Sequence, residues 1–131
     1  MIGLDTNVLV RYIMQDDIKQ SLVAARLVES LTTESPGFVP LVSIVELGWV
    51  LSSAYELSRS QLIEAFEALL RTKELVVEGG ATVWKGIRLL QSSGGDFADC
   101  LIACSAEAAG CAKTMTFDRG AAKNGGMTLL S

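Results

Sequence analysis

The segment MIGLDTNVLV (residues 1–10) decides how this chain is interpreted, because polar residues interrupt its apolar run. A short strand-like stretch ends at Leu4, and Asp5, Thr6 and Asn7 follow directly before the apolar pattern resumes. A buried carboxylate is costly unless a cation or a hydrogen-bond donor faces it. No basic residue adjoins Asp5, so its partner must come from elsewhere in the chain or be a metal ion.

Beyond this segment, strand and helix signals alternate along the chain. Apolar spacing of 3.6 residues predicts helices over 7–14, 19–33, 43–54, 62–70, 81–91 and 96–110. Short apolar runs predict strands over 2–4, 38–42, 74–78, 111–117 and 127–130, with a turn or short helix at 118–123. Such alternation favours parallel strands and right-handed crossovers. We therefore expect an α/β fold, a single-domain three-layer α/β/α sandwich over 1–131 with a central, mainly parallel sheet.

Two pairs of residues match the capping-box pattern of a helix start. They are Ser43 with Glu46, and Ser58 with Gln61. Both tryptophans, Trp49 and Trp84, lie at helical spacing among Leu and Val, which favours packing in the core or between subunits over stacking on nucleic-acid bases.

Composition limits both the class of protein and its location. The chain has 131 residues, the size of one domain, and 50% of them are hydrophobic. It contains no apolar run of membrane-spanning length and no basic segment typical of a signal peptide, so we expect a cytoplasmic protein without a membrane partner. The three cysteines include no C-x-x-C pair, which favours small buried thiols over a disulfide or a zinc site.

The chain has no histidine. This excludes histidine-based acid–base catalysis, a Ser-His-Asp triad and a His-ligated zinc centre. The formal net charge is −4, which argues mildly against binding nucleic acid through bulk charge. Without four carboxylates that we assign to one site, acidic and basic residues would be equal in number, at eleven each.

Those four carboxylates come from distant parts of the chain. Asp5 and Asp118 each follow a predicted strand, while Glu46 and Asp99 lie in the first turns of predicted helices. Sites in open α/β sheets lie beyond the carboxyl ends of the strands, so we expect the four to converge there. Oxygen-only ligation favours one or two Mg²⁺ or Mn²⁺ ions, which suit phosphodiester hydrolysis and need no histidine.

Four segments in this order closely resemble the PIN-domain ribonucleases. They are LDTNVLV at 4–10, SIVELGWVL at 43–51, DFADCLIAC at 96–104 and TFDRGAAK at 116–123. Within that family the chain is most similar to the VapC-type toxins of toxin–antitoxin pairs. The resemblance extends from Ile2 to about Leu130.

The resemblance implies roles for individual carboxylates. Asp5 and Asp99 would be the main metal ligands, Glu46 would contact the metal directly or through water, and Asp118 would complete the quartet. Asp96 is a second candidate, ranked below Asp99 because the family's ligand directly precedes the apolar run LIA.

Four further residues would support this site. Thr6 and Asn7 would hold Asp5 by hydrogen bonds, and Thr116 would orient Asp118 or a phosphate. Arg119 is the best candidate for a contact with the substrate phosphate. The resemblance also implies an RNA substrate, a homodimer and a cognate antitoxin protein whose C-terminal segment covers the site.

Each carboxylate also has a purely structural interpretation. Glu46 can complete a capping box, Asp5 and Asp96 can cap helices, and Asp118 can begin a turn. For Asp96 the cap is the preferred interpretation, and for Asp99 the metal ligand is.

Other functions remain open at this point. A phosphatase of the haloacid dehalogenase type would require a second Asp where the chain has Asn7, and a receiver domain would require a paired acid before Asp5. A catalytically inactive PIN-like interaction module is the remaining alternative to a nuclease.

Overall fold

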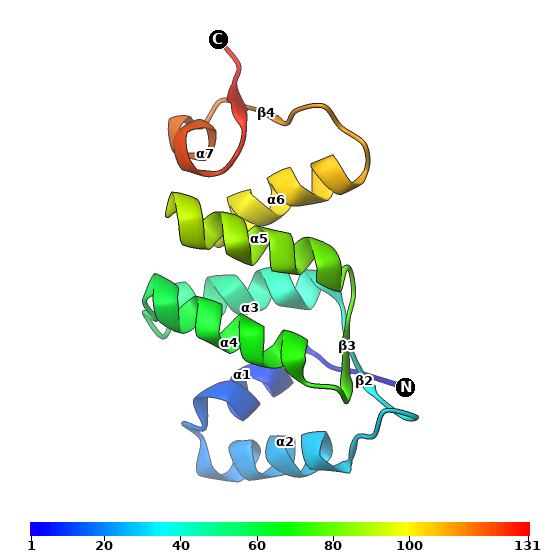
Figure 1. The fold of residues 1–131 in the computed structure, drawn as a ribbon. Coiled ribbons are helices and arrows are strands. Elements are labelled where there is room, and N and C mark those ends of the chain that lie inside the picture. The colour runs from blue at the N-terminus through cyan, green and yellow to red at the C-terminus, as the bar shows by residue number, and fades with distance from the viewer.

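Seven helices and five short strands alternate in a computed structural model that describes residues 1–131 (Figure 1). In chain order they are β1 (Ile2–Gly3), α1 (Thr6–Met14), α2 (Ile18–Ser30), β2 (Gly37–Val39), α3 (Leu41–Ser53), α4 (Arg59–Arg71), β3 (Leu75–Val77), α5 (Gly80–Ser93), α6 (Phe97–Ala108), β4 (Met115–Thr116), α7 (Arg119–Asn124) and β5 (Thr128–Leu129). The predicted alternation of strands and helices is confirmed. None of the seven helices combines the length and the apolar composition needed to cross a lipid bilayer.

Every strand pairing is parallel, as predicted for an α/β fold. The first sheet has the order β1-β2-β3, and β4 pairs with β5 in a second sheet. The expected central sheet is therefore present as two parallel pieces. Figure 1 shows β1 and α1 toward one end of the molecule and α7 and β4 at the other, with α3 to α6 between them.

The start of α3 differs from the predicted capping box. The helix begins at Leu41, after Pro40, and Ser43 is buried within it. The free N–H of Leu41 is satisfied from another element, because it donates to Oε1 of Glu78 at 2.9 Å. The prediction that Ser43 and Glu46 form a capping box is therefore wrong.

The second predicted capping box is confirmed. The Ser58 hydroxyl accepts from the N–H of Gln61 at 3.2 Å, and the Gln61 side chain accepts from the N–H of Ser58 at 2.9 Å. These two bonds satisfy free donors at the start of α4.

A stacked aromatic pair joins three helices in the core. The rings of Phe66 in α4 and Phe97 in α6 lie with centroids 4.5 Å apart. Gly48 of α3 lies against them so closely that a Cβ there would come within 2.6 Å of the Phe97 ring. The absence of a side chain at Gly48 therefore allows α3 and α6 to approach one another.

The tryptophans do not both pack as expected. Trp49 of α3 is 71% exposed, so it does not pack in the core of this chain, and of the two predicted roles only packing between subunits remains for it. Trp84 of α5 is half-buried and has the guanidinium groups of Arg71 and Arg88 over its ring, at 5.5 and 5.8 Å from the centroid. Trp49 is therefore the more exposed of the two indoles.

All three cysteines are free thiols, as expected from their spacing. Cys100 and Cys104 are buried in α6, whereas Cys111 is exposed. Burial raises the pKa of the Cys100 and Cys104 thiols, which keeps both in the unreactive protonated form.

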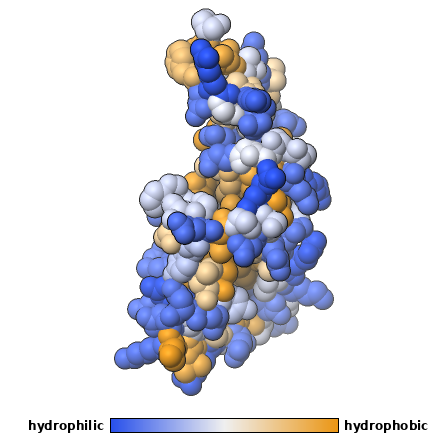
Figure 2. All heavy atoms as spheres, turned by 90° about the vertical axis from the view of Figure 1, so that its left-hand side faces the viewer, coloured by the Kyte–Doolittle hydropathy of each residue, from blue (hydrophilic) through white to orange (hydrophobic).

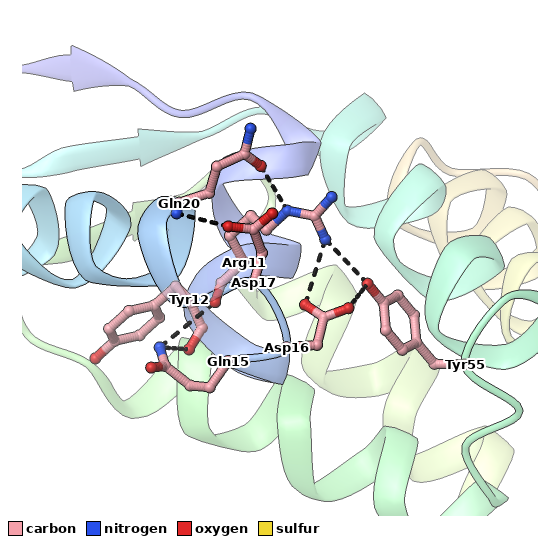
Figure 3. Close-up of polar contacts among 7 residues, drawn as sticks. All are labelled: Arg11, Tyr12, Gln15, Asp16, Asp17, Gln20 and Tyr55. Atoms are coloured by element: carbon pink, nitrogen blue, oxygen red, sulfur yellow. Dashed lines mark hydrogen bonds and ion pairs between the residues drawn. The ribbon is translucent and has the colours of Figure 1, made fainter.

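A polar network fixes the far end of α1 to the loop after α3 (Figure 3). The Tyr55 hydroxyl donates to Asp16 at 2.7 Å, and the Arg11 guanidinium donates to Tyr55 at 3.1 Å and to Asp16 at 3.3 Å. The same guanidinium donates to Gln20 at 2.7 Å. This network holds α1 against α2 and against the loop that follows α3, the helix that carries Glu46.

Replacing Tyr55 by Phe should make the melting temperature less dependent on pH. The Tyr55 hydrogen bond lowers the pKa of Asp16, so its stabilisation is lost as pH falls through that pKa. The same bond raises the pKa of Tyr55, so stabilisation is also lost as pH rises through the tyrosine's pKa. We expect Tyr55→Phe to lower the melting temperature by about 1–3 °C between roughly pH 4 and 10 and by less outside that window.

Thermal melts across this pH range measure the effect, with Tyr12→Phe as the matched control. The Tyr12 side chain takes no part in the network in Figure 3. A constant difference between wild type and Tyr55→Phe at every pH would contradict the prediction.

Candidate active site

The first group of candidate residues joins the start of α1 to the middle of α3. Asp5 caps α1, and its carboxylate accepts from the N–H of Thr6 at 2.8 Å. The buried Thr6 hydroxyl donates to Oε1 of Glu46 at 3.1 Å, across forty positions of sequence. Because Glu46 bonds to Thr6 and lies within the helix, its interpretation as a helix cap no longer applies.

The second group lies at the starts of α6 and α7. Asp96 caps α6 by accepting from the N–H of Asp99 at 3.2 Å, as the preferred interpretation of Asp96 predicts. The pKa of Asp99 is raised, first by burial and then by the negative charges of Asp96 and Asp118. These three carboxylates therefore interact electrostatically.

Asp118 is held by its own turn. Its carboxylate accepts from the N–H groups of Gly120 and Ala121 at 2.7 and 3.2 Å, and its own N–H donates to the Thr116 hydroxyl at 3.0 Å. The hydrogen bond from Asp118 to Thr116 agrees with an orienting role for that threonine. Arg119 is exposed and makes no ion pair.

One predicted contact has no counterpart in the structure. Asn7 is exposed, and its side chain donates no hydrogen bond to Asp5, whose carboxylate is bonded by the backbone of Thr6 instead.

A hollow of about 560 Å³ connects one member of each group. It lies between α3, the start of α4 and residues 94–98, and both Glu46 and Asp96 line it. Figure 2 views the side of the molecule on which α4 begins and α5 ends, and shows hydrophobic surface in the middle of that face between hydrophilic side chains. The exposed Trp49 and the aromatic Phe97 contribute to this lining.

The hollow has one basic lining residue, Arg59, which the sequence interpretation missed. Arg59 is the first residue of α4, and no sequence motif distinguishes it from other surface arginines. Its guanidinium lies against Gly94, where a Cβ would collide with Nη1. Only the folded chain, which brings the start of α4 beside the loop after α5, reveals that it belongs to this surface.

The two groups of carboxylates are not drawn together into one cluster. No three Asp, Glu or Cys side chains in the chain lie close enough to hold a metal ion jointly as they are placed. Asp5 and Glu46 belong to the part of the molecule around α1 and α3, whereas Asp99 and Asp118 belong to α6 and α7. The four predicted ligands therefore lie as two pairs, Asp5 with Glu46 and Asp99 with Asp118. The hollow is lined by Glu46 from the first pair and by Asp96, the neighbour of the second pair.

The chemistry of the donor set suits a hard cation. Every candidate ligand is a carboxylate, and neither of the two ion pairs of the chain involves any of them. A divalent cation that binds between neighbouring carboxylates stabilises their charged form. The residues present therefore fit Mg²⁺ or Mn²⁺ in ligand type.

Comparison with known proteins agrees with this fold and donor set. The chain matches the PIN domain family over residues 2–126. It belongs to that family, and its helices and parallel strands are those of the three-layer α/β/α PIN fold, which is a nuclease fold. A comparison with curated protein sequences gave no match.

Proposed function

We propose that this PIN-domain protein is a metal-dependent endoribonuclease that hydrolyses RNA phosphodiester bonds. The observation that carries the proposal is the position of Asp99 near two other carboxylates: burial first, and then the negative charges of Asp96 and Asp118, raise its pKa, and none of the three forms an ion pair with a basic side chain. A fold that retains such an arrangement without a protein cation is suited to binding a metal cation.

The proposed ligands of one or two Mg²⁺ or Mn²⁺ ions are Asp5, Glu46, Asp99 and Asp118. When bound, such an ion supplies a more acidic water and stabilises negative charge on phosphate oxygens. The protein's own contribution is to orient these ligands. Thr6 fixes one carboxylate oxygen of Glu46, and the Asp118 turn leaves one oxygen of its carboxylate free of backbone hydrogen bonds.

The proposed function extends to a toxin of a toxin–antitoxin pair, acting as a homodimer in the cytoplasm and held inactive by a cognate antitoxin. Its support is the similarity of the four sequence segments to VapC-type toxins. Exposed apolar side chains on α2 offer a surface for a protein partner, with Ile18, Leu22 and Val23 exposed by 90, 50 and 60%.

Removing the metal should abolish cleavage. We expect antitoxin-free protein to cut a mixed RNA pool in the presence of Mg²⁺ or Mn²⁺ and to lose at least about 100-fold in rate with EDTA, because no side chain of this chain replaces a metal-activated water. Excess Mg²⁺ should restore the rate. Fragment lengths on a denaturing gel and calorimetric titration of Mg²⁺ provide the measurements.

The opposite result has a clear meaning. Protein that neither cleaves any RNA nor binds Mg²⁺ or Mn²⁺ by calorimetry would act as an interaction module with a PIN fold. The separation of the carboxylates into two groups is the observation that favours this second candidate.

A further inference from the structure

We propose that the hollow beside Glu46 and Asp96 binds one unpaired nucleotide of single-stranded RNA, with its base stacked on Trp49 and an adjacent phosphate on Arg59. This inference rests on the proposed nuclease function and adds to it a binding site for one nucleotide of the substrate. The hollow falls within the range of volumes that enclose small-molecule ligands.

Trp49 is available for stacking. Its side chain is 71% exposed at the hollow, and its neighbour one helical turn earlier, Val45, is 37% exposed. The other tryptophan provides a contrast within the same chain, because two guanidinium groups already lie over the ring of Trp84. An exposed indole beside two carboxylates gives an unstacked base a flat apolar surface, and such surfaces bind any of the four bases.

Arg59 supplies the positive charge that this acidic chain otherwise lacks at the hollow. It is the single cation among the fifteen lining residues and takes part in neither ion pair of the chain. The glycine at position 94 leaves room for its guanidinium against the loop. A guanidinium with free donors binds phosphate through paired hydrogen bonds.

The surroundings of Arg59 indicate the side from which a phosphate approaches. A second recess that Arg59 also lines carries Glu64 and Glu67, which repel phosphates and are not among the candidate metal ligands. The hollow has Glu46 and Asp96 instead, which belong to the two candidate ligand groups. A nucleotide bound between Trp49 and Arg59 therefore lies beside Glu46, a proposed metal ligand, and beside Asp96, which caps the helix that carries Asp99.

This arrangement requires single-stranded RNA. Bases inside a duplex are stacked on their neighbours and cannot stack on a side chain, whereas bases of loops and single strands can. The occupant is therefore an unpaired segment of RNA, and a duplex of the same sequence should bind weakly.

The test uses the two tryptophans as separate reporters. Trp84→Phe protein keeps the indole of Trp49 alone, and Trp49→Phe protein keeps the indole of Trp84 alone. Each of the two variants is titrated with a short oligouridine in the presence of Ca²⁺ instead of Mg²⁺. Ca²⁺ also binds carboxylate oxygens, but in a looser geometry. We expect the RNA to quench the fluorescence of Trp84→Phe protein and to leave that of Trp49→Phe protein unchanged.

Affinity measurements complete the test. Trp49→Ala should weaken the Kd for the single strand by about 5- to 100-fold. Arg59→Gln should weaken it by about tenfold and reduce its salt dependence, and Arg59→Lys should recover part of the loss. Arg88→Gln, which removes an arginine that lies over Trp84, serves as the control and should leave the Kd unchanged.

The failure of this inference differs from the failure of the proposed function. Metal-dependent RNA cleavage with unchanged Trp49 fluorescence and an unchanged Kd in Arg59→Gln would overturn the nucleotide site and leave the nuclease intact. Absence of both cleavage and RNA binding in wild-type protein would overturn the proposed function itself. Conversion of a wild-type dimer to a monomer by Trp49→Ala would overturn the nucleotide site by assigning the indole to a second copy of the chain.

Discussion

Asp99→Asn should abolish RNA cleavage while leaving the metal-free protein at least as stable as the wild type. We expect the rate to fall by at least about 100-fold, because the amide that replaces the carboxylate is a weak ligand for Mg²⁺. Stability should be unchanged or higher, because burial and the charges of Asp96 and Asp118 penalise the ionised side chain of Asp99. Opposite effects on activity and stability are typical of residues retained for function.

The measurement combines an RNA cleavage assay with thermal melts in EDTA. Asp17→Asn is the matched control, because it also removes one negative charge but leaves a residue that caps α2 equally well. It should retain the wild-type cleavage rate. Cleavage by Asp99→Asn within a few-fold of the wild type would remove Asp99 from the proposed ligands.

Phe66→Ala should be the most destabilising single change among those considered. Phe66 is 1% exposed and stacks on Phe97, and truncation of a buried phenylalanine costs about 3–5 kcal/mol of unfolding free energy. For a chain of this size the melting temperature should fall by about 10 °C or more. Phe97 directly follows Asp96, so loss of the stack should also loosen the start of α6.

Denaturant unfolding of Phe66→Ala and Phe117→Ala measures this effect. Phe117 is 80% exposed, so the same chemical change there should leave the unfolding free energy within about 0.5 kcal/mol of wild type. Equal losses in the two variants would show that the aromatic stack contributes nothing specific to the core.

Local signals in the sequence predict most of the helices and strands. The capping box at Ser58 and the cap at Asp96 involve residues three positions apart, and both are confirmed. The start of α3 could not be predicted in this way, because the N–H of Leu41 is satisfied by Glu78, which lies thirty-seven positions away, directly after β3. Sequence patterns describe near neighbours, and this contact exists only after folding.

The same limit applies to the candidate site. Carboxylates that follow strands or open helices could be identified from sequence, but the electrostatic link between Asp99 and Asp118 depends on how α6 and α7 pack. For Trp49 the spacing of apolar residues did not distinguish the core from an outer face, because α3 is apolar on several sides and the pattern does not reveal which side is covered within the chain. Arg59 carries no local signal at all, since its place in the hollow depends on the loop at Gly94.

The close contact at Gly48 limits which substitutions the space between α3 and α6 can accept. This glycine sits between the aromatic pair and the hollow, and even one added methyl group would have to displace the Phe97 ring. Such a substitution widens or distorts the space between α3 and α6 without altering a carboxylate. Because Phe97 is the first residue of α6, such a change would also shift the start of the helix that carries Asp99, so the shape of the hollow and the placement of the proposed ligand are coupled through Gly48.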